Sequence, residues 1–155
     1  MSGVWDPIGI CAGVLLKGKL IFQSITRLGY RWDQPINNDE LKETWEKWTK
    51  EMKECENVII SRSILPLEQL KKDELHCELV GFCDGSNVGY ASVIYLRWRN
   101  HDESIVDVKF LGAKAKVASI RGNTTPRNEL CGALTLSRLT GLLWKLSKEA
   151  KYRCI

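Results

Sequence analysis

The sequence lacks the patterns that define several classes of protein. Its six cysteines stand at positions 11, 55, 77, 83, 131 and 154, so no C-x-x-C or C-x-x-H spacing occurs and the usual structural zinc frameworks are excluded. There are only two histidines, and neither lies beside a nucleophilic serine or cysteine motif. The longest stretch without an acidic or basic residue, Gly85 to Leu96, is well short of the roughly 20 residues that a membrane-spanning helix needs. We therefore predict no association with a membrane.

A secretory leader is also missing from the beginning of the sequence. Asp6 precedes the first short apolar run, and Lys17 and Lys19 follow it, which reverses the charge order of a signal peptide. The sequence therefore predicts an intracellular protein. In a reducing compartment most of its cysteines are expected to be free thiols that behave as small core residues.

The length and charge fit one domain or two small ones. The 155 residues include 23 Lys and Arg against 19 Asp and Glu, a net charge of +4. The charge is divided unevenly, with a net of −2 over residues 1–78 and +6 over residues 79–155. Two interpretations of the basic half stay open: ordinary variation of a solvated surface, and a face that binds a polyanion such as nucleic acid.

The first half of the chain has helical periodicity. Apolar residues at steps of three and four predict a helix over residues 9–28. Asn38 can cap a second helix, whose apolar stripe includes Trp45 and Trp48. Because both tryptophans lie on that stripe, we predict that they belong to the core rather than to a surface that stacks bases.

The second half changes to an extended pattern after a linker over residues 56–78, which contains a short β-like run at Val58–Ile60. Three segments rich in Val, Ile and Tyr follow, and short connections between them favour antiparallel neighbours. The motif Thr124-Thr125-Pro126 then opens a long helix. The expected order is therefore strand, strand, strand, helix.

Two carboxylates occupy distinctive places in this pattern. Asp84 ends the first predicted strand, where a charged group next to buried residues needs a partner or a cation. Glu129 lies in the first turn of the last helix, and its neighbours Leu130 and Ala133 are predicted to face the sheet. Taken singly, each acid has an ordinary explanation, because Asp-Gly-Ser is a common turn and Glu is common in a first helical turn.

An Asp at the end of the first of three antiparallel strands, with a Glu at the start of the helix after the third, resembles the arrangement in the ribonuclease H fold. The whole chain is similar to the Pao (Bel/Pao) long-terminal-repeat retrotransposon polyprotein. The similarity covers nearly all of residues 4–145 and rests on the ordered motifs WDPIGI, GYRWDQPI, LKETWEKW, VGFCDGSNVGYASVIYLR, AKAKVA and TTPRNELCGALTLSRL. The resemblance implies an α+β fold. A helical connection would occupy residues 1–74, and a partial, truncated ribonuclease H-like unit of three antiparallel strands and a helix would occupy residues 75–155.

The resemblance also implies an activity: cleavage of the RNA strand of an RNA–DNA hybrid by two-metal hydrolysis with Mg²⁺. Asp84 and Glu129 match the family's first two metal carboxylates. The third should follow the last helix, and the sequence ends soon after it. The other acids between Asp84 and Glu129 are Asp102, Glu103 and Asp107. They lie on or beside a predicted hairpin rather than beyond the last helix, so they are poor replacements for the third carboxylate. We therefore expect a polyprotein fragment whose catalysis is absent or severely weakened.

Further residues and partners follow from the same resemblance. Ser86 and Asn128 are expected to position substrate or water, and four basic residues are expected to contact phosphates: Lys114, Lys116, Arg121 and Arg127. The expected partners are an RNA–DNA hybrid or another nucleic acid and the rest of the polyprotein, namely reverse transcriptase and integrase. The expected location is the cytoplasm or a virus-like particle.

Three alternatives to a nuclease remain open. The chain could be a nucleic-acid-binding or assembly module without catalysis, or a decayed reading frame. This segment is also labelled a Pao retrotransposon peptidase, the A17 family. An aspartic peptidase needs Asp-Thr/Ser-Gly, whereas Asp84 is followed by Gly85-Ser86.

Overall fold

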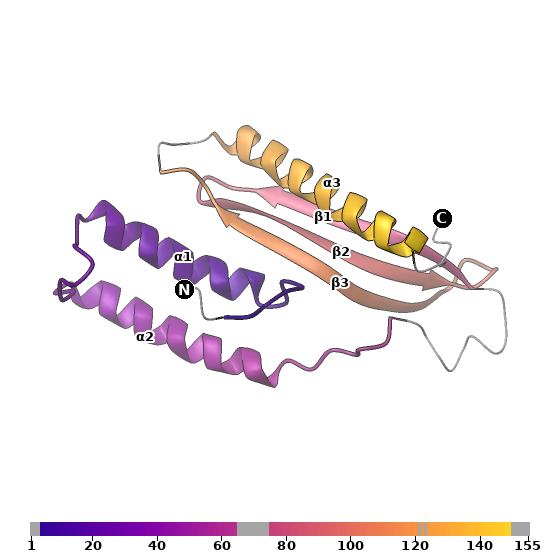
Figure 1. Ribbon diagram of the computed structural model, residues 1–155, viewed down its shortest axis with the longest axis horizontal. Coiled ribbons are helices and arrows are strands. Elements are labelled where there is room, and N and C mark those ends of the chain that lie inside the picture. The colour runs from indigo at the N-terminus through magenta and orange to yellow at the C-terminus, as the bar shows by residue number, and fades with distance from the viewer. Residues whose placement is uncertain (1–3, 65–74, 121, 123, 150–155) are drawn as a thin grey trace.

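The computed structural model describes residues 4–64, 75–120, 122 and 124–149 of the chain (Figure 1). The order of elements confirms the expected α+β class, with helices first, then three antiparallel strands and a final helix. The elements are α1 (Ala12–Arg27), α2 (Asp39–Glu54), the short 3₁₀ helix η1 (Cys55–Asn57), β1 (His76–Gly85), β2 (Gly89–Arg99), β3 (Ile105–Val117) and α3 (Thr125–Glu149).

A side chain caps the start of α2, whereas the cap residue of α1, Cys11, makes no capping hydrogen bond through its side chain. The Asp6 carboxylate accepts hydrogen bonds from Ile10 N at 2.9 Å and Cys11 N at 3.0 Å, just ahead of α1. The Asn38 side chain accepts from Leu41 N at 2.9 Å, as predicted for the cap of α2. Such caps matter because the first amides of a helix have no partner within it.

The predicted extended run at Val58–Ile60 forms no strand in the described part of the chain. Ile59 is 94% exposed there. Branched side chains favour a strand only when a neighbouring strand supplies hydrogen bonds and packing, and this run has neither among the described residues. The boundary predicted after residue 74 falls outside the residues that the structure describes, so the division into two domains stays a prediction.

The three strands form one antiparallel sheet in the order β1-β2-β3. In its register Gly85 of β1 pairs with Tyr90 of β2, and Tyr90 pairs with Lys116 of β3. The end of β1, the start of β2 and the end of β3 therefore lie at the same end of the sheet. The hairpin between β2 and β3 lies at the opposite end.

Helix α3 lies on one side of the sheet, and α1 and α2 lie on the other side (Figure 1). On the face toward α3, the buried Ser92 hydroxyl donates to Gly132 O at 2.8 Å. On the other face, a Cβ at Gly89 would lie 3.5 Å from a methyl carbon of Leu16 in α1. The segment before α1 also joins the sheet directly, because Ala113 N of β3 donates to Ile8 O at 2.8 Å.

The face that α3 turns to the sheet differs from the prediction. Leu130 is 71% exposed and Ala133 is also exposed, whereas Asn128 and Gly132 are buried against the sheet. The reason is distance: a Cβ at Gly132 would lie only 3.1 Å from Asp84 O. The backbones approach too closely for a leucine, so α3 packs there through small residues.

The described helices include none that is long and apolar enough to cross a bilayer.

Candidate functional site

The end of β1 and the first turn of α3 meet at Gly85. A Cβ at this buried glycine would lie 2.8 Å from Asn128 O and would overlap Glu129 N. Asp84 comes immediately before this contact and Glu129 forms part of it. The structure therefore brings the backbones of the two predicted metal residues close together at one end of the sheet, although they are far apart in the sequence. Asp84 pairs with Ala91, so its side chain lies on the sheet face opposite to the one on which Gly85 meets α3.

The turn after Asp84 is held by a set of short hydrogen bonds. Ser86 N donates to Gly89 O at 2.8 Å, and the Ser86 hydroxyl donates to the same oxygen at 3.2 Å. The Asn128 amide donates to Ser86 O at 2.6 Å. Because Asn128 is fully buried, its amide fastens α3 to this turn and does not reach the surface.

Both candidate metal ligands are open to solvent. Asp84 and Glu129 are exposed, and one oxygen of Asp84 accepts from Gly85 N at 2.8 Å. Asp84 also lines a recess of about 340 Å³ between the start of α1 and the sheet, together with Phe82, Ala91 and Phe110. This recess forms only when α1 packs against the sheet, so no local pattern in the sequence predicts it.

Carboxylate oxygens are the hard ligands that Mg²⁺ prefers, and Mg²⁺ is often bound by one or two carboxylates with water and substrate phosphates completing its shell. Asp84 and Glu129 fit that requirement in chemistry and in number. Within the described residues, no group of three or more His, Cys, Asp or Glu side chains is arranged to hold a metal. The two acids therefore offer a partial ligand set.

The predicted phosphate contacts lie near the same end of the sheet. Lys114 pairs with Ser92 and Lys116 pairs with Tyr90, and both lysines are exposed. Arg127 is exposed in the first turn of α3. Arg121 lies outside the residues that the structure describes.

The carboxylates with shifted pKa values lie at the opposite end of the sheet. A hydrogen bond from Arg97, at 2.7 Å, lowers the pKa of Glu78 on β1. Hydrogen bonds from Ser104, the shorter at 2.6 Å, lower the pKa of Asp102 in the β2–β3 hairpin. Both acids therefore have local partners there, remote from Asp84.

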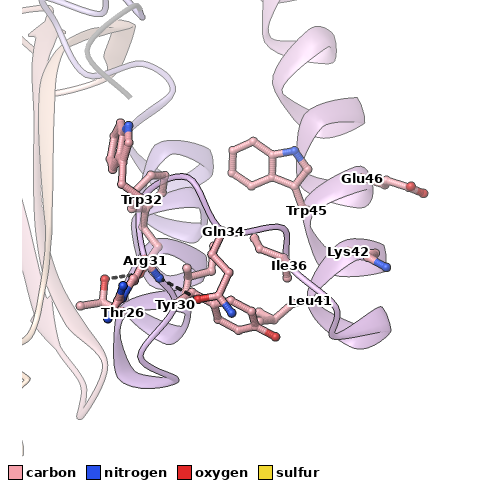
Figure 2. Close-up of a pocket in the computed structure, with 12 residues that line it drawn as sticks. Thr26, Tyr30, Arg31, Trp32, Gln34, Ile36, Leu41, Lys42, Trp45 and Glu46 are labelled. Carbon is pink, nitrogen blue, oxygen red and sulfur yellow. Dashed lines mark hydrogen bonds between the residues drawn. The ribbon is translucent and has the colours of Figure 1, made fainter.

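A second concave surface lies on the α1–α2 hairpin (Figure 2). This groove, of about 410 Å³, lies between the end of α1, the connecting loop and the start of α2. Its lining includes four aromatic side chains: Phe22, Tyr30, Trp32 and Trp45. The turn-rich segment between the helices, which includes Tyr30 and Trp32, is the part of the sequence that indicates this groove.

The two tryptophans that were predicted to be core residues have different environments in the structure. Trp48 is 8% exposed, and its indole donates to Val14 O of α1 at 2.7 Å, so the prediction is confirmed for this residue. The prediction is wrong for Trp45, which is 37% exposed and lines the groove. Their ring centroids are 4.9 Å apart. The two tryptophans are one helical turn apart, yet Trp48 is buried between α1 and α2 while Trp45 lies at the edge of this interface.

The comparisons with known proteins agree with this architecture. The model of the family described as Pao retrotransposon-like RNaseH-like domain matches residues 1–153. No curated protein and no solved structure matches the chain. Because the family model spans nearly the whole sequence, and the fold has three antiparallel strands followed by a helix, the chain belongs to the Pao retrotransposon-like RNaseH-like domain family.

Proposed function

We propose that this domain acts on RNA–DNA hybrids, with Asp84 and Glu129 as the Mg²⁺ ligands for hydrolysis of the RNA strand. The observation that supports the proposal is the close approach of Gly85 to Asn128 and Glu129, which joins the end of β1 to the first turn of α3. Two exposed carboxylates are thereby positioned by rigid elements rather than by a mobile loop.

The residues around the acids suggest how a hybrid would be held. Lys114, Lys116 and Arg127 are exposed cations near the same end of the sheet, and they would contact phosphates of the bound strands. Asn128 would keep the turn after Asp84 in place through its bond to Ser86 O. Bound Mg²⁺ would supply Lewis-acid stabilisation of charge on the phosphate and lower the pKa of a coordinated water.

The proposed place of the domain is within a retrotransposon polyprotein, beside reverse transcriptase and integrase, in the cytoplasm or in a virus-like particle. With Asp84 and Glu129 as the two assigned ligands, we expect the domain by itself to bind Mg²⁺ weakly and to cleave slowly. We do not propose peptidase activity, because Asp84 precedes Gly85-Ser86 rather than Ser-Gly or Thr-Gly.

Substitution of Asp84 by asparagine tests the nuclease proposal. Asp84→Asn removes a charged metal ligand at nearly constant volume, so we expect Mg²⁺-dependent cleavage of a labelled hybrid to fall at least about tenfold. Asp33→Asn, at an exposed acid in the α1–α2 loop, is the matched control and should cleave like the parent. Equal cleavage by the parent and Asp84→Asn would refute the assigned role of this carboxylate.

A second candidate function, nucleic-acid binding without catalysis, is favoured by the exposed cations near the site. For the double variant Lys114→Gln/Lys116→Gln we expect weaker binding to a hybrid at low salt and a salt dependence smaller by roughly two charges. The measurement is a binding titration at several salt concentrations. Lys47→Gln/Lys50→Gln changes two exposed lysines of α2 and should leave binding unchanged. Equal losses in both double variants would indicate a general charge effect.

A further inference from the structure

The open end of the α1–α2 hairpin brings two cysteines together. Cys11 comes directly before α1, and Cys55 comes directly after α2. The helices lie side by side and antiparallel (Figure 1), and their mutual position is given by the bond from Trp48 Nε1 to Val14 O at 2.7 Å. Cys11 lies one turn before Val14, and Cys55 lies two turns after Trp48. Both cysteines therefore lie on the faces through which the two helices contact each other.

The surroundings of the two thiols agree with direct contact. Both cysteines are free and half-buried. The Cys55 thiol donates to Glu51 O at 3.7 Å, and the Cys11 amide is held by the Asp6 carboxylate at 3.0 Å. Burial, followed by a hydrogen bond with the Cys55 thiol, raises the pKa of Cys11 to about 11. The Cys11 thiol thus interacts with the Cys55 thiol and, more weakly, with the charge of Asp6.

We propose that Cys11 and Cys55 form a reversible disulfide that closes the open end of the hairpin. The reaction uses a disulfide oxidant, for which oxidised glutathione is the probe. The Cys55 thiolate attacks one glutathione sulfur and releases one reduced glutathione. The Cys11 thiolate then attacks the Cys55 sulfur of this mixed disulfide and releases the second. The two cysteines lose two protons and two electrons, and oxidised glutathione becomes two reduced molecules.

Two physical consequences follow from this linkage. The disulfide encloses the whole hairpin and restricts the unfolded chain, so it should raise the melting temperature on the order of 10 °C. The closing step should accelerate with pH, roughly tenfold per unit below the pKa of Cys11, because only the thiolate attacks. The raised pKa also means that the disulfide forms slowly at neutral pH.

The experiment oxidises the full chain with oxidised glutathione at pH 7, 8 and 9, blocks the remaining thiols and maps the linked peptides by mass spectrometry without reduction. We expect one linkage, Cys11 to Cys55, that forms faster at higher pH and disappears with dithiothreitol. Thermal melts of the oxidised and reduced chain measure the stabilisation.

Two variants make the result specific. Cys55→Ser should lose both the linkage and the oxidation-dependent rise in melting temperature, while its reduced form melts near the reduced parent. Cys83→Ser removes an exposed cysteine of β1 and should form the linkage like the parent. The proposal is overturned if glutathione remains attached at Cys11 or Cys55 without linking them. It is also overturned if other cysteine pairs form in their place.

Discussion

Replacement of Gly85 by alanine is expected to lower the free energy of unfolding by about 3 kcal/mol, at the upper end of the cost of overpacking. The added Cβ would lie 2.8 Å from Asn128 O and would overlap Glu129 N, both in the backbone of α3. A backbone atom cannot move away as the end of a flexible side chain can. The variant must therefore displace the first turn of α3 or the end of β1, and urea unfolding measures the cost.

A glycine within α3 itself provides the control for this prediction. Gly141 is exposed, and a Cβ there would have no neighbour within 4 Å. Gly141→Ala should therefore stabilise the chain by roughly 0.5–1 kcal/mol, because alanine favours a helix over glycine. If Gly85→Ala and Gly141→Ala had the same effect, the close contact between β1 and α3 would be disproved.

The Gly85 variant also bears on the site. The contact at Gly85 fixes the backbone beside Asp84 relative to the backbone of Glu129. If the two acids share an ion, displacement of α3 should therefore weaken Mg²⁺ binding even in the fraction of molecules that remain folded. Isothermal titration with Mg²⁺, at a temperature where the variant is folded, measures this effect. Unchanged Mg²⁺ affinity in a destabilised Gly85→Ala chain would show that the two acids do not share an ion.

Truncation of Trp48 to alanine is expected to lower the free energy of unfolding by about 4 kcal/mol, within the usual range for a buried aromatic residue. Trp48 is 8% exposed, and its indole donates to Val14 O at 2.7 Å. The substitution would leave a cavity between α1 and α2 and remove the bond that joins the two helices. Urea unfolding followed by far-ultraviolet circular dichroism measures the loss.

Trp45 offers the matched control, because it is the same residue type one turn earlier in α2. It is 37% exposed, and its indole ring lies at the groove (Figure 2). Trp45→Ala should cost less than half as much as Trp48→Ala, since less apolar surface is buried in the native state. If Trp45→Ala lowered the free energy of unfolding more than Trp48→Ala, Trp45 and not Trp48 would be the core residue.

Local sequence patterns predicted the type and order of the elements. The spacing of apolar residues located α1 and α2, the alternation to Val- and Ile-rich segments located the three strands, and Asn38 was correctly expected to cap α2. These features follow from interactions between residues close in the chain. The strand-like run at Val58–Ile60 forms no strand among the described residues, because a strand also needs a neighbouring strand to pair with.

The site was predictable only in part. Resemblance to a known family directed attention to Asp84 and Glu129, but the pattern contained nothing about the distance between them. The proximity of their backbones comes from the contact of Gly85 with the first turn of α3. The same contact explains the burial of Asn128, whose amide bonds to Ser86 O at 2.6 Å. From the sequence alone, a polar residue next to a candidate ligand is expected at the surface, so the burial of Asn128 could not be predicted.

The amino-acid order was therefore sufficient for the helices and the strands, because hydrophobic period, capping and turn chemistry act over a few residues. The candidate acids came from the resemblance to a known family. Tertiary packing decided which face of α3 meets the sheet, which tryptophan is buried and which strand end approaches the backbone of Glu129. Those outcomes depend on how closely two backbones can approach. At Gly85 and Gly132 the absence of a side chain allows that approach, and the approach in turn leaves Leu130 at the surface.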